Sequence, residues 1–136
     1  MSELKNAAAE DILTALAESP QLGEGWVIDD RFTNVVMRVL SKDALKEAWP
    51  ALETIFPESF EEESLGQATN EVQHLVSQMG GLRDDQFLFV NQDASGLVSF
   101  TAIWPWQNAP QASLRFGFVG VDRLDVALFE RLLIES

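Results

Sequence analysis

The sequence contains no cysteine and no tyrosine, and only a single histidine. Without cysteine, disulfide bonds, thiolate metal ligands and cysteine nucleophiles are excluded. Zinc sites draw mainly on histidine and cysteine, so one histidine argues against a typical zinc site. Basic residues are also few: 9 Lys and Arg stand against 22 Asp and Glu, which gives a net charge of −13. Because phosphates and anionic lipids are bound by cations, this charge argues against autonomous binding to nucleic acid or membranes.

The sequence also lacks the signals that direct a chain out of the cytoplasm or into a membrane. No apolar run approaches the roughly 18 residues that span a bilayer. The N-terminus has no basic start followed by an apolar stretch, so we expect no secretory signal and a cytoplasmic protein. The 136 residues, of which 46 % are hydrophobic, predict one domain over residues 1–136 that buries a core without disulfides or a structural metal.

Four segments of the sequence are predicted to be helices. They cover residues 3–18, 43–56, 70–79 and 124–134. The second and third show apolar residues at three-and-four spacing, and Ser41 and Thr69 are their N-cap candidates. The pair Gly80-Gly81 is a stop signal for the third helix. Pro50 lies inside the second segment and predicts a kink or a break into two short helices.

The remaining apolar runs predict strands, and the second of them is rich in β-branched residues. The expected strands are a short one at 26–28 and longer ones at 32–40, 86–90, 97–104 and 112–119. The acidic stretch from Glu58 to Gly66 is predicted to be a loop. The last three strands follow one another closely, which is typical of an antiparallel meander. These patterns predict an α+β fold: an antiparallel sheet of three to five strands with about four helices packed mainly on one face.

Residues suited to catalysis or metal binding are sparse. His74 lies beside the apolar stripe of its predicted helix, which is typical of a surface or helix-flank histidine, and no Gly-x-Ser-x-Gly motif supplies a nucleophile. The adjacent pairs Asp29-Asp30 and Asp84-Asp85 are expected to be solvated carboxylates in turns. The six arginines are scattered and define no phosphate clamp. We therefore predict no enzyme activity, no cofactor and no metal site.

The negative charge is concentrated in one stretch of the sequence. Between Glu47 and Leu82 there are seven glutamates and no Lys or Arg. Such a surface creates a negative potential that steers a basic protein partner. A solvated, solubilising surface is the alternative interpretation of the same pattern. The candidate partner-binding residues in this stretch are Glu58, Glu61, Glu62, Glu63 and Glu71.

A second candidate feature is the tryptophan-rich segment from Trp104 to Pro110, between two predicted strands. Tryptophan is enriched in binding hot spots because it combines a large apolar area with a polar N–H group. Trp106 is therefore a candidate partner-binding residue. The alternative interpretation places Trp104 in the core and folds Trp106 over the edge of the sheet.

A small acidic domain without catalytic residues can neutralise a basic protein by covering its cationic surface. Toxins that act on nucleic acid carry such surfaces, and bacterial immunity proteins that inhibit toxins are often small, acidic and cytoplasmic. The composition therefore favours a protein-binding inhibitor of the immunity type, whose partner is a basic toxin or effector. Two other classes stay open: a small-ligand-binding or enzymatic α+β domain, and an adaptor or secretion chaperone. The sequence is compatible with a monomer or a homodimer.

Overall fold

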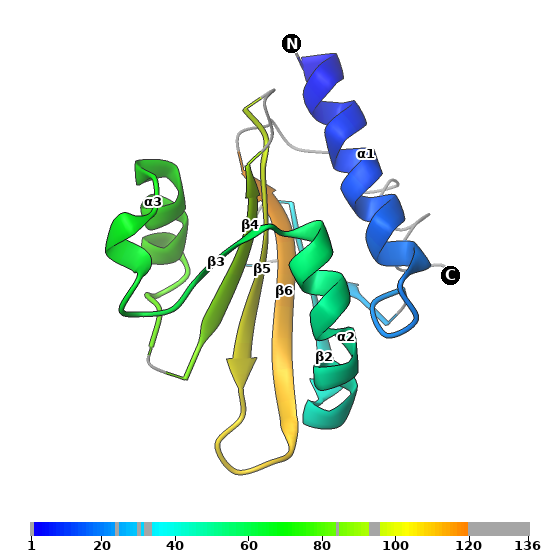
Figure 1. Cartoon of the computed structure of the whole chain (residues 1–136), viewed down its shortest axis with the longest axis vertical. Coiled ribbons are helices and arrows are strands. Elements are labelled where there is room, and N and C mark those ends of the chain that lie inside the picture. Colours follow the sequence, from blue (N-terminus) through cyan, green and yellow to red (C-terminus); the bar gives the residue numbers. More distant parts are fainter. Residues whose placement is uncertain are drawn as a thin grey trace.

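In this computed structural model, the described residues form a six-stranded antiparallel sheet with helices on both faces (Figure 1). The structure describes residues 2–23, 25–29, 31, 34–83, 85–92 and 96–119. The strands lie in the order β1-β2-β6-β5-β4-β3. They are β1 (Val27–Ile28), β2 (Val35–Ser41), β3 (Glu58–Phe60), β4 (Phe87–Gln92), β5 (Val98–Pro105) and β6 (Gln111–Val119). The predicted α+β class is confirmed.

Strand β6 joins the two halves of the sheet. It pairs with β5 next to it in sequence, and on its other side with β2 from Val35↔Gly117 to Ser41↔Gln111. The meander of β3, β4, β5 and β6 is thereby attached to the N-terminal hairpin of β1 and β2. The predicted meander at the end of the described chain is therefore confirmed, and it is longer than expected.

The prediction of three to five strands was wrong, because the sheet contains one more strand, the short β3. Its residues were expected to form part of a loop, but Glu58 pairs with Val90 and Phe60 pairs with Leu88. Three residues are too few to show an alternating pattern, and two of them are exposed. Pairing with β4, rather than local sequence preference, makes this segment a strand.

Three α-helices and one short 3₁₀ turn lie in the described residues. They are α1 (Ser2–Glu18), α2 (Lys42–Ile55), η1 (Leu65–Gln67) and α3 (Asn70–Gln78). The predicted caps are confirmed: the Ser41 hydroxyl accepts from Ala44 N at 3.1 Å, and the Thr69 hydroxyl accepts from Val72 N at 3.4 Å. Gly80 and Gly81 both have φ +95°, a conformation that glycine adopts without strain and that ends α3. The helix predicted at 124–134 lies outside the described residues.

Helix α2 runs through Pro50 as one continuous element, so the predicted break is absent. Proline removes one backbone N–H from the helix and leaves the carbonyl one turn earlier without its usual donor. Lys46, which carries that carbonyl, and Pro50 are both exposed, so water can replace the missing donor. The apolar stripe of Leu45, Ala48 and Leu52 meanwhile stays buried.

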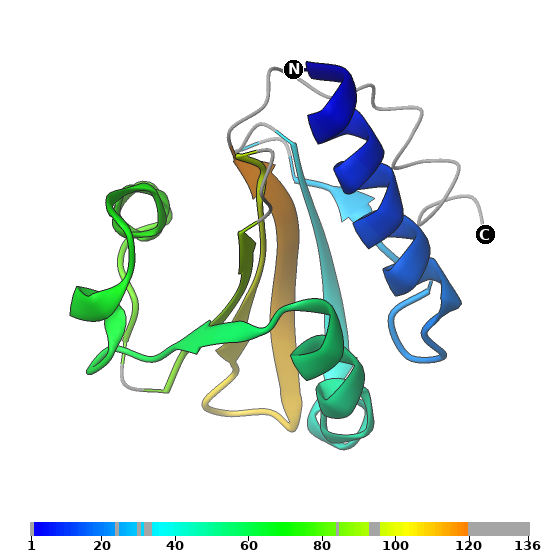
Figure 2. The same ribbon diagram turned by 45° about the horizontal axis from the view of Figure 1, so that its top comes forward.

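The helices cover both faces of the sheet, which corrects the prediction that they pack mainly on one. Figure 2 shows α1 and α2 on one face and α3 on the other. Along β6, Leu114, Phe116 and Phe118 belong to the core beneath α1 and α2. Along β5, Val98, Phe100 and Ala102 belong to the core beneath α3. Strands buried on both faces read as nearly continuous apolar runs, so their sequence does not reveal where each helix packs.

Gly117 occupies a tightly packed position on β6, and its replacement is the sharpest test of this packing. A Cβ atom there would lie 2.6 Å from the backbone oxygen of Asn34 and 3.0 Å from Cζ of Phe100. Gly117→Ala is therefore expected to lower the free energy of unfolding by about 1–3 kcal/mol. Gly66→Ala is the control, because a Cβ atom there meets nothing within 4 Å. Urea denaturation measures both, and equal losses of stability would contradict the described packing.

Candidate functional site

The predicted acidic residues gather at one edge of the sheet. Strand β3 is the outermost strand on that side, and Glu58 lies on it with an exposed side chain. The three glutamates that follow β3 are exposed, as is Glu71 in the first turn of α3. We call this surface the acidic edge; it consists of Glu58, Glu61, Glu62, Glu63 and Glu71.

A compact turn holds the central glutamates of the acidic edge. Ser64 closes the turn: its Oγ accepts a hydrogen bond from Glu61 N at 2.9 Å, and its own N donates to Glu61 O at 3.1 Å. Leu65 N donates to the same carbonyl at 3.0 Å and begins the 3₁₀ turn η1. These bonds fix the backbone of the turn, so Glu62 and Glu63 project from an ordered base.

A chain of side-chain hydrogen bonds connects the start of α3 to β3. Gln92 on β4 donates from Nε2 to Glu58 Oε1 at 2.8 Å, and its Oε1 accepts from the Thr69 hydroxyl at 3.3 Å. Thr69 is the N-cap of α3, two residues before Glu71. Val72, which is fully buried, anchors this first turn of the helix to the core. The fold therefore brings Glu71 to the same edge as Glu58.

Trp106 lies apart from the acidic edge. It belongs to the turn between β5 and β6, and its Nε1 donates to Ser113 Oγ on β6 at 2.8 Å. Lys42 Nζ donates to the carbonyl oxygen of Trp106 at 3.2 Å. Trp106 is 40 % exposed. Strands β4 and β5 separate β6, to which Trp106 is bonded, from β3 at the acidic edge. The structure does not combine Trp106 and the glutamates into one surface.

An ion-pair network that the sequence did not reveal lies on the α3 side of the sheet. Arg115 Nε donates to Asp29 Oδ2 at 3.0 Å, and Arg31 contacts the same carboxylate from Nε and Nη2 at 3.1 and 3.2 Å. The guanidinium of Arg115 also lies over the Trp104 ring, 4.1 Å from its centroid. Asp29 was expected to be solvated, but it is only 6 % exposed. Since 86 residues separate it from Arg115, local sequence carries no signal of the pair.

Burial and hydrogen bonding act in opposite directions on the Asp29 carboxyl. Burial alone would raise its pKa, but hydrogen bonds from Arg31 and Arg115 outweigh it and lower the pKa below 3.8. Burial lowers the pKa of Arg115, and the hydrogen bond to Asp29 opposes that effect. An arginine stays protonated at any physiological pH. The network is therefore an ionised pair in the folded protein.

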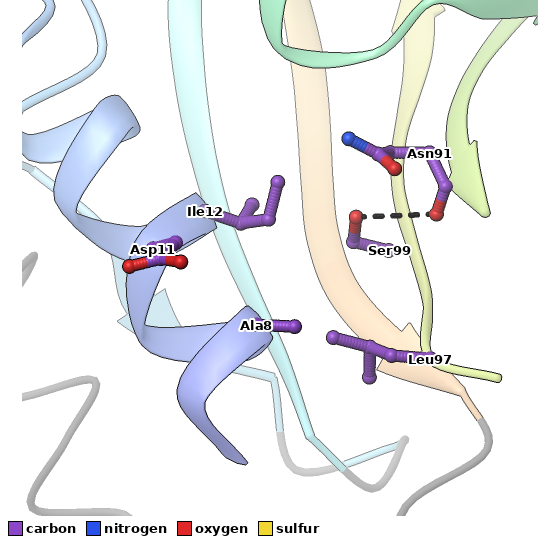
Figure 3. Close-up of a pocket in the computed structure, with 6 residues that line it drawn as sticks. All are labelled: Ala8, Asp11, Ile12, Asn91, Leu97 and Ser99. Atoms are coloured by element: carbon purple, nitrogen blue, oxygen red, sulfur yellow. Dashed lines mark hydrogen bonds between the residues drawn. The ribbon is translucent and has the colours of Figure 1, made fainter. Parts of the chain in front are cut away.

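A small cavity lies on the opposite face, between α1 and strands β4 and β5 (Figure 3). Its volume is about 110 Å³. It is lined by Ala8, Asp11, Ile12, Asn91, Leu97 and Ser99. Asn91 donates from Nδ2 to Ile55 O at 2.8 Å, which fixes its amide at the cavity wall. His74 is exposed on α3, on the other face of the sheet, so this cavity does not join it to Trp106.

Neither a metal centre nor a relative identifies the chemistry of the protein. Within the described ranges, no three or more His, Asp or Glu side chains are grouped so that they could hold a metal ion. In the same part of the chain, no helix has the length and apolar character needed to cross a bilayer. No family model matches the sequence, and no curated protein and no solved structure is detectably similar to it.

The ion pair predicts how stability depends on pH. Because the folded-state pKa of Asp29 is lowered below 3.8, its contribution is fully present above about pH 4 and is lost as the pH falls through the folded-state pKa. Asp29→Asn should lower the free energy of unfolding near pH 7 by about 1–3 kcal/mol, because Arg115 loses its charged partner. Urea titrations from neutral to acidic pH should show the difference between the two proteins shrinking in acid. A constant difference would contradict the prediction.

Proposed function

We propose that this protein is an inhibitor of the immunity type, which binds a basic toxin or effector and blocks its working surface. The observation that supports the proposal is the acidic edge, where five exposed glutamates from β3, the following turn and α3 lie at one side of the sheet. No Lys or Arg occurs from residue 47 to residue 82 to neutralise them. The surface is therefore complementary to a cationic one.

Electrostatics gives such a surface two effects on a basic partner. Exposed charges within a Debye length of about 10 Å act together at moderate salt, so neighbouring glutamates raise the rate of encounter with a cationic protein. They also select against anionic partners, because like charges repel at close range. A protein that binds nucleic acid must expose Lys and Arg for the phosphates. Covering those cations is enough for inhibition, and it requires no catalytic group.

The hydrogen bonds beneath the acidic edge support a rigid recognition surface. Ser64 fixes the turn after β3, and Gln92 links β3 to the start of α3. A surface that is ordered before binding loses less conformational entropy when the partner docks. The cavity beneath α1, by contrast, is smaller than the roughly 300–1,000 Å³ of typical ligand pockets. This cavity therefore gives no support to a small-ligand-binding or enzymatic domain.

Charge reversal tests the proposal. The tagged protein would be used to capture partners at low salt from cells of the source organism, and the captured basic protein would then be purified. The triple variant Glu61→Lys, Glu62→Lys, Glu63→Lys should reduce its association rate about tenfold or more, and salt should reduce the wild-type rate in the same way. Stopped-flow or surface plasmon resonance measures both.

A matched control separates local from global charge. Asp11→Lys, Glu18→Lys, Asp43→Lys changes the net charge equally, but these exposed residues lie on α1 and α2. This variant should retain most of the wild-type association rate. Equal losses in the two triple variants would contradict a role for the acidic edge.

The activity of the partner then distinguishes an inhibitor from an adaptor or chaperone. An inhibitor should abolish the partner's activity at one-to-one stoichiometry and protect cells that express the partner. Tight binding without loss of activity would overturn the inhibitor proposal and favour an adaptor.

A further inference from the structure

Exposed apolar side chains gather on a second surface, far from the acidic edge in the sheet order. Val27, Val39 and Trp106 are 53 %, 38 % and 40 % exposed. The register places them together: Val27 pairs with Met37, Met37 pairs with Arg115, and Val39 pairs with Ser113, which also binds the Trp106 indole. Paired residues of neighbouring strands share a face. This surface, formed by β1, β2, β6 and β5 on the α3 side, is here called the Arg115 face.

Among the described residues, most of the exposed large apolar side chains lie on the Arg115 face. Among the described residues, one further large apolar side chain is exposed, that of Ile28. Ile28 pairs with Val36, which belongs to the core beneath α1 and α2, so it lies on the opposite face. No helix in the described ranges lies over the Arg115 face where Val27 and Val39 are exposed, because α3 packs over the half of the sheet that contains β4 (Figure 2).

Arg115 lies at the centre of this surface with unused hydrogen-bonding capacity. Its side chain is only 8 % exposed, and its hydrogen bond runs from Nε to Asp29. In the described part of the chain, the buried polar atoms without a partner are Ser19 Oγ, Thr101 Oγ1 and Trp104 Nε1. The Nη atoms of Arg115 are not among these buried atoms, and they make no hydrogen bond there. They are therefore donors that an approaching ligand can reach.

The neighbours of Arg115 hold its guanidinium in one orientation. Asp29 binds the Nε edge, and the Trp104 ring supports one flat side of the group. Trp104 Nε1 is itself a donor without a partner among the described residues. Arg115 and Asp29 form this ion pair in a protein whose net charge is −13. Fixed guanidinium donors in a partly apolar setting suit a planar anionic acceptor.

We propose that the Arg115 face is a docking surface for a second protein, and that Arg115 binds a carboxylate which that protein presents between apolar side chains. The carboxylate is an Asp or Glu side chain or a free C-terminus. Its two oxygens accept from the Nη groups of Arg115, while the flanking apolar side chains cover Val27, Val39 and Trp106. This site is independent of the acidic edge, and it does not require the partner to be basic.

The dimensions and charge of the surface favour a protein over smaller or more highly charged ligands. The outer strands β1 and β5 are three strand spacings apart, which is about 14 Å. A small carboxylic acid cannot cover that width, but an extended peptide segment can. A phosphate or nucleic acid carries several negative charges and would be repelled by the overall charge of −13. A single carboxylate limits that repulsion.

A peptide selection tests the proposal with a defined probe. A displayed library of random peptides with free carboxyl termini would be selected on the full-length protein, and the enriched peptides would be synthesised for calorimetry. Enrichment of a carboxylate next to Phe, Leu, Ile or Trp is expected. Replacing that Asp or Glu by Asn or Gln, or amidating the C-terminus, should weaken binding about tenfold.

Variants of the protein locate the peptide. Trp106→Ala should weaken binding about tenfold or more, and Val39→Ala a few-fold. Ile28→Ala is the matched control on the opposite face and should bind as wild type does. In Arg115→Gln, the carboxylate substitution in the peptide should have no further effect, which is the signature of a direct pair. If Arg115→Gln does not fold, the exposed-residue variants and the peptide substitutions still decide the outcome.

Three results would overturn the proposal. One is enrichment of basic peptides whose binding is lost in the Glu61→Lys, Glu62→Lys, Glu63→Lys variant, which would place the binding at the acidic edge. Another is binding that is insensitive to Trp106→Ala and Val39→Ala. The third is a wild-type dimer in analytical ultracentrifugation that Trp106→Ala dissociates, which would identify a second copy of the chain as the occupant. Failure of the acidic edge to bind a basic protein would leave this proposal standing.

Discussion

The antiparallel pairing of β6 with β2 is the constraint on which the rest of the structure depends. It joins segments that are far apart in the sequence, and it brings Asp29, which follows β1, to Arg115 in the middle of β6. It also places β6 inside the sheet, between β2 and β5, where most of its residues are buried. Without this pairing, the N-terminal hairpin would have no partner, and a two-stranded hairpin is at best marginally stable alone.

Arg115 is buried in strand β6, and burying its charge costs hydration free energy. An ion taken from water loses several kcal/mol of hydration, and a buried pair often stabilises a fold no better than apolar side chains of the same shape would. Asp29 and the Trp104 ring offset part of that loss, and the Nη groups, which are not among the buried unpaired atoms, are left to solvent or a ligand. Stability is thus a weak explanation for an arginine at this position, and recognition is a stronger one.

The two surfaces act over different distances. The acidic edge is exposed and carries several charges of one sign, so its influence extends through solvent for about a Debye length and weakens with salt. The Arg115 face acts only on contact, through a guanidinium fixed in place and apolar area that must lose water. Long-range charge governs association rates, whereas desolvated contacts govern dissociation rates. For a partner that contacts both surfaces, the acidic edge would raise the association rate and the Arg115 face would lower the dissociation rate.

Local sequence determined the elements whose signals are local: the caps at Ser41 and Thr69, the stop at Gly80-Gly81, the long strands, and the position of the glutamates in one stretch. It could not show that Glu58 to Phe60 forms an edge strand, since that depends on pairing with β4. Nor could it assign helices to faces, because apolar runs buried on both sides lose their alternation. Only the tertiary structure brought Asp29 to Arg115 and separated Trp106 from the glutamates. Those relations depend on strand order and register, which long-range pairing decides and no sequence window contains.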